Sequence, residues 1–304
     1  MKDLKIIVLC GGISPERDVS LVSGDYLAKA LSKFYSVEKI ILEENKIPAN
    51  LDPKTCIVHP VLHGEYGENG DLQKDLEDAG ITYVGSNSLS SKLCMLKPAT
   101  KAFIRNVGVK TAKEFIFDKS DKISAKALRE SLGDRIIIKP ADKGSSVGLS
   151  FCDSLEKLEI ALQNLPEGEC LAESYFEGRE LSVGVLGGEV TGIVEIAPAE
   201  GLYDYETKYN ATDTKYTCPA LLDKEIESQI KEAALKIFNI CQCRDFARID
   251  FIVKGKDFIC LEVNTLPGMT PSSLLPKTAT CVGLDFDNLC KKMLSYAIER
   301  HKNK

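Results

Sequence analysis

Long apolar runs, metal-ligand spacings and paired cysteines are scarce in this sequence, and each absence excludes a class of protein. No stretch approaches the roughly 18 apolar residues that a membrane-spanning helix requires. The short apolar run within Met1–Cys10 is too brief for the core of a signal peptide. No CxxC pair occurs, and the three histidines do not have the spacing of a zinc site. We therefore expect a cytoplasmic protein with no membrane partner.

The charge of the chain argues against a nucleic-acid-binding protein. Lys and Arg number 39 and Asp and Glu number 45, which gives a net charge of −6. Such a chain lacks the broad basic surface that attracts nucleic acid or an anionic membrane. The eleven cysteines are an odd number. Those that lie in or beside apolar runs, Cys10, Cys152, Cys170 and Cys260, are typical of small buried side chains in a reducing compartment.

The length of 304 residues exceeds what one hydrophobic core usually supports, which predicts two or three subdomains. The largely apolar run Leu4–Leu9 ends near two glycines and precedes a helical pattern, as at the start of an α/β domain with a parallel sheet. We predict an N-terminal α/β domain over residues 1–95, a central subdomain over 96–179 and a C-terminal subdomain over 180–304.

Two strand patterns near the C-terminus are the most informative part of the chain. Apolar residues recur at every second position in Arg248–Val253 and again in Ile259–Asn264. The turn-forming residues 254–257 lie between them, so the two segments are expected to pair as a hairpin.

The register of this hairpin predicts a site for a cation. If both apolar sets face one core, Phe251 lies opposite Leu261 and Asp250 lies opposite Glu262. Directly opposed carboxylates repel each other unless a cation neutralises them, and Mg²⁺ prefers such oxygen ligands. The alternative is a solvated polar face of the sheet, on which the opposed carboxylates only cost stability.

Phosphate binding has no familiar signature here, because neither a Walker loop nor a G-x-G-x-x-G motif occurs. The turn Lys143–Gly148 nevertheless comes soon after an apolar strand pattern and contains glycines, serines and a lysine. Backbone N–H groups and hydroxyls in such a turn can cradle a phosphate, with Lys139 adding positive charge. A simple surface turn is the alternative.

Several segments resemble the motifs of the D-alanine–D-alanine ligase family. In chain order they are Gly11–Ser20, His59–Gly70, Ile138–Gly148, Tyr203–Tyr209, Arg248–Asp250 and Glu262–Thr270. Each one alone is weak evidence, but together they match the family in order and over nearly the whole chain. The resemblance implies an α/β, three-subdomain ATP-grasp fold with an N-terminal Rossmann-like parallel-sheet domain.

The activity that this resemblance implies is the ATP-dependent ligation of two D-alanines to D-alanyl-D-alanine, through an acylphosphate, for peptidoglycan precursor synthesis. The implied requirements are ATP and two Mg²⁺ ions, for which Mn²⁺ can substitute, and the implied assembly is a homodimer. Two alternatives stay open, a D-alanine–D-lactate ligase and a non-catalytic ATP-binding regulator. Tyr209 at its matching position favours the dipeptide product.

By position within the matching motifs, the resemblance also implies roles for individual residues. The implied catalytic residues are Glu16, Ser145, Tyr209, Arg248 and Gly268. The implied substrate-binding residues are His63, Ser273 and Leu274. The implied ATP-binding residues are Lys97, Lys139, Ser146, Glu173, Ser174, Tyr175, Phe176, Glu180 and Lys208. The implied metal ligands are Asp250, Glu262 and Asn264.

The roles follow the expected chemistry of the family. Glu16 is expected to bind the ammonium of the first D-alanine and to join a hydrogen-bond chain with Ser145 and Tyr209. The polar segment Tyr203–Tyr216 has few apolar anchors, which predicts a lid that excludes water from the acylphosphate.

Overall fold

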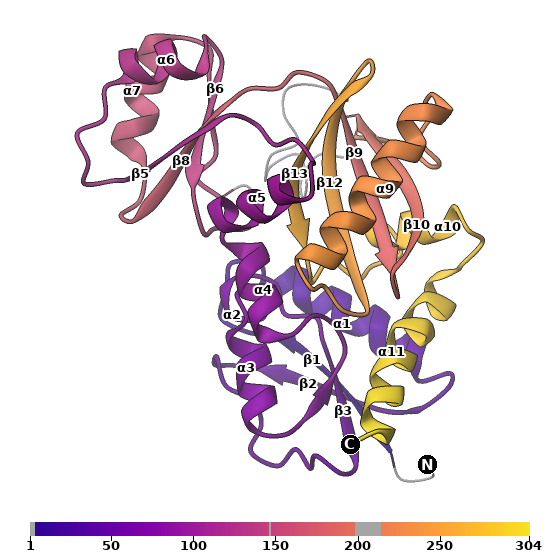
Figure 1. The fold of residues 1–304 in the computed structure, drawn as a ribbon. Helices are drawn as coiled ribbons and strands as arrows, with labels where there is room; N and C mark the ends of the chain where they lie inside the picture. The colour runs from indigo at the N-terminus through magenta and orange to yellow at the C-terminus, as the bar shows by residue number, and fades with distance from the viewer. Residues whose placement is uncertain (1–3, 146, 198–213) are drawn as a thin grey trace.

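The computed structural model describes residues 4–145, 147–197 and 214–304, and it contains three sheets that lie in successive parts of the chain (Figure 1). Ser146, Lys208 and Tyr209 lie outside the described residues, as does the predicted lid Tyr203–Tyr216 apart from its last three residues.

The first sheet is parallel and has the strand order β2-β1-β3-β4. Its strands are β1 (Lys5–Gly11), β2 (Ser36–Leu42), β3 (Cys56–Pro60) and β4 (Thr82–Tyr83). Every residue of β1 after Lys5 is buried, as expected for a central strand of a parallel sheet that is covered on both faces. Helices α1 (Arg17–Leu31) and α3 (Asp71–Asp78) follow β1 and β3 along the chain.

The second sheet is antiparallel and has the order β5-β8-β6-β7. Its strands are β5 (Glu114–Asp118), β6 (Ile136–Pro140), β7 (Ser150–Cys152) and β8 (Glu169–Ser174). Helices α6 (Ala125–Leu132) and α7 (Leu155–Asn164) share a hydrophobic core with it. The turn between β6 and β7 carries Ser145 and, with it, the predicted phosphate cradle.

The third sheet is antiparallel and has the order β11-β10-β9-β12-β13. Its strands are β9 (Arg179–Leu186), β10 (Glu189–Ala197), β11 (Lys215–Thr217), β12 (Phe246–Lys254) and β13 (Asp257–Asn264). Helix α9 (Lys224–Ile240) buries the apolar residues of one face, among them Ile226, Ile230 and Ile237, in the core under this sheet.

The other helices of the described residues lie between strands or after the last strand. They are α2 (Glu65–Glu68), α4 (Ser88–Met95), α5 (Lys97–Asn106), α10 (Leu274–Thr280) and α11 (Phe286–Lys302). Helix α11 returns to the first sheet, where Leu289 and Met293 share a core with Ile6 and Leu27 (Figure 1). Each predicted domain range contains one sheet, and the boundaries at 95 and 179 stay predictions. No helix in the described part of the chain is long and apolar enough to span a membrane.

The hairpin of β12 and β13 confirms the predicted pairing of the two carboxylates and contradicts the predicted pairing of their apolar neighbours. Asp250 lies opposite Glu262, as predicted. Phe251 pairs with Cys260, so the predicted pairing of Phe251 with Leu261 is wrong. The reason is a β-bulge, in which one extra residue of β13 opposes β12 and reverses the alternation beyond it. Cys260 therefore packs in the core in place of Leu261.

Candidate active site

A cavity of about 480 Å³ is lined by side chains from all three regions of the chain. A smaller cavity of about 60 Å³ shares Glu68, Ser145, Glu262 and Asn264 with it. Nine residues predicted from the sequence line the larger cavity: Glu16, His63, Ser145, Arg248, Glu262, Asn264, Gly268, Ser273 and Leu274. Lys97 lines the smaller one. The structure therefore brings most of the predicted catalytic and substrate-binding residues to one place.

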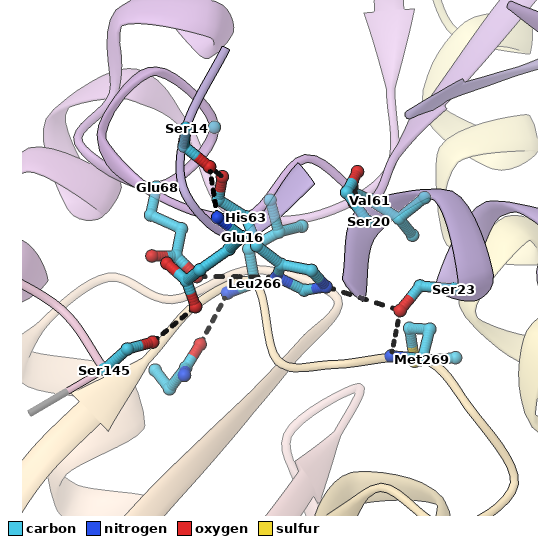
Figure 2. Close-up of polar contacts among 12 residues, drawn as sticks. Ser14, Glu16, Ser20, Ser23, Val61, His63, Glu68, Ser145, Leu266 and Met269 are labelled. Carbon is cyan, nitrogen blue, oxygen red and sulfur yellow. Dashed lines mark hydrogen bonds and ion pairs between the residues drawn. The ribbon is translucent and has the colours of Figure 1, made fainter. Parts of the chain in front are cut away.

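Glu16 and Ser145 join the first and second regions across the cavity. The Ser145 hydroxyl donates a hydrogen bond to Glu16 Oε1 at 2.5 Å (Figure 2). The Glu16 N–H donates to Ser14 Oγ at 3.2 Å, and the Ser14 hydroxyl in turn donates to the His63 carbonyl at 2.6 Å. Ser145 has a φ of +48°, in the left-handed region, so the turn that holds it is strained. Glu16, just before α1, is thus held at its carboxylate by Ser145 and at its backbone N–H by Ser14.

His63 lies between a carboxylate and a hydroxyl. Its Nδ1 is 3.6 Å from Glu68 Oε1, and its Nε2 is 3.4 Å from Ser23 Oγ (Figure 2). Ser23 Oγ also accepts the Met269 N–H at 3.4 Å, which ties this group to the loop before α10. Burial raises the pKa of Glu68, while His63 opposes that rise. Sequence reasoning did not assign Glu68, although it lies five residues after His63 in the same motif.

Lys97 begins α5 and faces the smaller cavity. Its ammonium donates a hydrogen bond to the Lys143 carbonyl in the turn after β6. Burial and, after it, the neighbouring Lys139 lower the pKa of Lys97 to about 8, against the opposing effects of Glu262 and Glu173. An ammonium placed in this way gains strongly from an added anion.

Glu173, predicted to bind the nucleotide, lies between two lysines. Lys139 Nζ is 2.5 Å from Glu173 Oε2, and Lys101 Nζ also bonds to this carboxylate. Burial alone raises the pKa of Glu173, but Lys139 and Lys101 outweigh it and hold the pKa at about 2. Lys101 also lies 2.7 Å from Glu114. Sequence reasoning missed Lys101, although it lies one helical turn after Lys97.

The other predicted nucleotide residues with described positions follow Glu173. Ser174 ends β8, and its N–H bonds to the Lys113 carbonyl at 2.9 Å. The Tyr175 ring packs 4.8 Å from the Phe151 ring. Phe176 follows Tyr175 and is half-buried, and Glu180 lies on β9 opposite Ile252. None of these four lines either cavity described above.

The predicted metal ligands share one polar face of the β12–β13 hairpin. Arg248 Nη2 lies 2.8 Å from Asp250 Oδ2 and 3.6 Å from Glu262 Oε1, so its guanidinium offsets the repulsion between the opposed carboxylates. The Ser182 hydroxyl donates to Asp250 Oδ1 at 2.7 Å. In residues 4–145, 147–197 and 214–304, no group of three or more His, Cys, Asp or Glu side chains is arranged to hold a metal ion.

The oxygen donors on this face nevertheless fit Mg²⁺. Glu262 and Asn264 line both cavities beside Lys97, where a substrate phosphate can supply further oxygens. Mg²⁺ commonly binds one or two protein carboxylates and takes its other ligands from water and phosphates. The Asn264 side-chain oxygen meanwhile accepts the Leu266 N–H at 3.0 Å.

The far wall of the larger cavity is the start of α10. Ser273 Oγ accepts the Thr270 N–H at 3.1 Å, and Leu274 is the first residue of the helix. A Cβ at Gly268 would lie 3.1 Å from Ser273 Oγ, so glycine lets the backbone approach closely there. Lys277 and Tyr216 complete this wall, with the ammonium 4.8 Å from the centre of the ring.

Known proteins are similar to this chain over nearly its whole length. The family described as "D-ala D-ala ligase C-terminus" matches residues 103–295. The D-alanine–D-alanine ligase of Aquifex aeolicus is 39% identical over 97% of this chain and 100% of that protein. The enzyme of the same name from Syntrophotalea carbinolica is 36% identical over 98% of this chain and 97% of that protein.

Solved structures show the same architecture. The D-alanine–D-alanine ligase of Bacillus anthracis complexed with ATP superposes with a TM-score of 0.84 at 29% identity, covering 99% of each chain. The VanG D-Ala:D-Ser ligase of Enterococcus faecalis superposes with a TM-score of 0.83 at 27% identity, covering 97% of this chain and 100% of that one. The fold is therefore an α/β ATP-grasp fold, and the predicted fold class is confirmed. The chain belongs to the D-alanine–D-alanine ligase family.

Proposed function

We propose that this chain is the enzyme that joins two D-alanines to D-alanyl-D-alanine, with ATP as phosphoryl donor and ADP and phosphate as further products. The observation that carries this proposal is the cavity in which Glu16, Ser145, Arg248 and Ser273 come together from three regions of the chain. The dipeptide is a precursor of peptidoglycan. The expected homodimer and cytoplasmic location stay predictions.

The first D-alanine binds at the Glu16 end of the cavity. The Glu16 carboxylate pairs with the ammonium of the substrate, and the Ser145 hydroxyl keeps one of its oxygens in place. His63 closes this end, supported by Glu68 and Ser23. The carboxylate of the substrate then points toward Lys97 and Glu262, which line the adjoining cavity.

Phosphoryl transfer takes place between this carboxylate and ATP. A carboxylate oxygen of D-alanine attacks the γ-phosphorus, the bond to the β-phosphate oxygen breaks, and ADP leaves. Lys97 and Lys139 hold the phosphates and offset their charge, which is the main contribution a protein makes to this step. Asp250, Glu262 and Asn264 would hold Mg²⁺, which when bound supplies further positive charge at the phosphate oxygens.

Ligation follows at the α10 wall. The Leu274 N–H and the Ser273 hydroxyl hold the carboxylate of the second D-alanine at the start of α10. Its neutral amine attacks the acylphosphate carbon, a C–N bond forms, the C–O bond to phosphate breaks, and the amine proton is released. The Arg248 guanidinium and the Gly268 N–H stabilise the tetrahedral oxyanion, and such a donor is typically worth about 10²–10³ in rate.

The test is a reaction of the purified protein with ATP and Mg²⁺, in which phosphate release is measured and the products are identified by mass. D-Alanine alone, D-alanine with D-lactate and D-alanine with D-serine are compared. We expect phosphate release with D-alanine alone and D-alanyl-D-alanine as the product. Preferential formation of D-alanyl-D-lactate would establish the depsipeptide ligase. ATP binding without turnover on any of these acceptors would favour the non-catalytic regulator.

A further inference from the structure

The cysteines differ sharply in exposure. Nine of the eleven are buried, whereas Cys218 is exposed and Cys281 is partly exposed. Thiols in a tightly packed core are shielded from dissolved reagents, so only these two can readily meet a reactant from solution. They are 63 residues apart in the sequence, yet they lie together in the fold.

The contacts between the two segments are specific. Cys218 Sγ lies 3.1 Å from the Lys277 carbonyl oxygen, and Cys281 Sγ lies 3.9 Å from the same oxygen. Both thiols thus lie beside one carbonyl oxygen. Burial raises the pKa of Cys281 to about 12, and the neighbouring Cys218 thiol contributes to that rise. The two least buried cysteines of the chain are therefore direct neighbours.

The pair lies next to residues of the α10 wall of the larger cavity. Cys218 follows Tyr216 by two residues at the end of β11, and Cys281 follows Lys277 by four at the end of α10. Tyr216 and Lys277 both line the cavity and contact each other. A covalent bond between the two sulfurs would join the two segments that carry this part of the wall.

We propose that Cys218 and Cys281 form a site for reversible thiol–disulfide exchange that controls the α10 wall of the cavity. The co-reactant is a small disulfide such as oxidised glutathione. The Cys218 sulfur, after loss of its proton, attacks one sulfur of the small disulfide and expels one thiolate. Cys281 then attacks the mixed disulfide, loses its proton and expels the second thiolate. Two protein thiols are oxidised and one small disulfide is reduced to two thiols.

Exposure assigns the order of these two steps. Cys218 is exposed and meets the reagent first, whereas Cys281 is partly covered, because its sulfur packs against Gly192 of β10. A Cβ at Gly192 would lie 2.8 Å from Cys281 Sγ. The mixed disulfide at Cys218 is thus short-lived when Cys281 is present and accumulates when Cys281 is replaced.

The experiment uses the full chain, reduced and then equilibrated with mixtures of reduced and oxidised glutathione. Free thiols are blocked with an alkylating reagent, and disulfides are located by peptide mass spectrometry. The same samples are assayed for ADP release with D-alanine. Variants Cys218→Ser and Cys281→Ser are the matched controls, and Cys281→Ala replaces Cys281→Ser if the hydroxyl disturbs packing.

We expect a Cys218–Cys281 disulfide in the wild-type chain, removed by dithiothreitol, and a mixed glutathione disulfide at Cys218 in Cys281→Ser. The crosslink should lower turnover by about fivefold or more, as for coupling between adjacent structural elements, and dithiothreitol should restore it. Both variants should keep their turnover in oxidised glutathione. The effect on turnover rests on the proposed ligase activity, whereas location of the disulfide does not, so the two can fail separately.

Three results would overturn this inference. The first is glutathione retained on wild-type Cys218 with no crosslink to Cys281. The second is a crosslink that preferentially involves one of the nine buried cysteines. The third is a complete Cys218–Cys281 crosslink that leaves both turnover and the KM for D-alanine unchanged in an active enzyme.

Discussion

The Glu16 end and the Lys97 end of the site hold their functional groups by different means. At the Glu16 end, hydroxyls and a histidine ring connect side chains from different regions, through Ser145, His63 and Ser23. At the Lys97 end, Lys139 and Lys101 enclose Glu173 in a buried ion-pair network. Hydrogen bonds between polar groups are individually modest, whereas breaking a buried ion pair is costly.

This difference suggests how each end responds to its substrate. The Glu16 network bridges the regions, so it can open and reform as the amino acid enters. The fold of the Lys97 end itself holds its charges near one another, and burial and Lys139 lower the pKa of Lys97 to about 8. Anion binding there relieves an electrostatic cost that the fold has already incurred.

Glu262 lines both cavities and is a predicted metal ligand, so its replacement should have the largest effect. We expect Glu262→Gln to lower kcat by at least about 100-fold through loss of charge stabilisation. Its side chain is 37% exposed, so the thermal unfolding temperature should change little. Exposed Glu189→Gln on β10 is the control. Substantial turnover of Glu262→Gln at ordinary Mg²⁺ would rule out Glu262 as an essential metal ligand.

Lys101 tests whether the ion-pair network supports the Lys97 end. Its side chain is only 3% exposed, so Lys101→Met removes the buried cation shared by Glu173 and Glu114 and leaves them only Lys139 and Arg105, respectively. We expect a loss of about 3–5 kcal/mol in the free energy of unfolding, measured in urea. Arg105→Met, which removes the exposed partner of Glu114, should cost only about 0–1 kcal/mol. Equal losses in the free energy of unfolding for Lys101→Met and Arg105→Met would contradict the importance of the buried ion-pair network.

Ser145 tests the Glu16 end in the same way. Ser145→Ala removes the hydroxyl that donates to Glu16 and should cost about 1–3 kcal/mol in transition-state binding. We expect a lower kcat/KM for D-alanine and an unchanged dissociation constant for ATP. Ser150→Ala on β7 is a nearby control. If Ser145→Ala weakened ATP binding as much as it weakened D-alanine use, the two ends would not be separable.

The smallest predicted effect is a pH dependence at the Lys97 end. Because the pKa of Lys97 is lowered to about 8, its ammonium in the free protein loses its proton as the pH rises through that value. The dissociation constant for ATP should then rise by up to about tenfold per pH unit. Lys97→Arg keeps its charge and should show a flatter profile between pH 7 and 9 by calorimetry. If ATP binding by the wild type and by Lys97→Arg depended on pH in the same way, another group would be responsible for the titration.

Loss of the Lys97 proton should weaken ATP binding but stabilise the free protein. An unfolded chain keeps Lys97 protonated up to its usual, higher pKa, so above pH 8 the unfolded state binds more protons than the folded state. The contribution of Lys97 to the free energy of unfolding therefore rises with pH above about 8. Urea denaturation without nucleotide should show this rise in the wild type and not in Lys97→Met.

The sequence predicted the functional face of the hairpin better than its core. Alternation was enough to place Asp250 opposite Glu262, because the period of a strand is two. It could not reveal the bulge that pairs Phe251 with Cys260, since one extra residue leaves no signal in a pattern of apolar residues. The bulge lies just beyond the opposed carboxylates, so the error did not reach the site.

Lys101 and Glu68 show the other limit of sequence reasoning. Helical spacing places Lys101 on the same side of α5 as Lys97, but its partners Glu114 and Glu173 come from β5 and β8. Nothing local indicates that these strands close over the lysine. Glu68 similarly becomes a cavity residue only because the 61–68 segment folds against Ser145 and Glu262. Both residues reach the site through packing between distant segments, which a single sequence does not reveal.

The fate of the carboxylate oxygen tests the central claim most directly. D-Alanine labelled with ¹⁸O in its carboxylate is incubated with the enzyme, ATP and Mg²⁺, and the released phosphate is examined by mass spectrometry. If the carboxylate attacks the γ-phosphorus and the amine then expels phosphate, one labelled oxygen per dipeptide should appear in inorganic phosphate. Unlabelled phosphate, or release of AMP and pyrophosphate, would contradict an acylphosphate route and the proposed roles of both ends of the cavity.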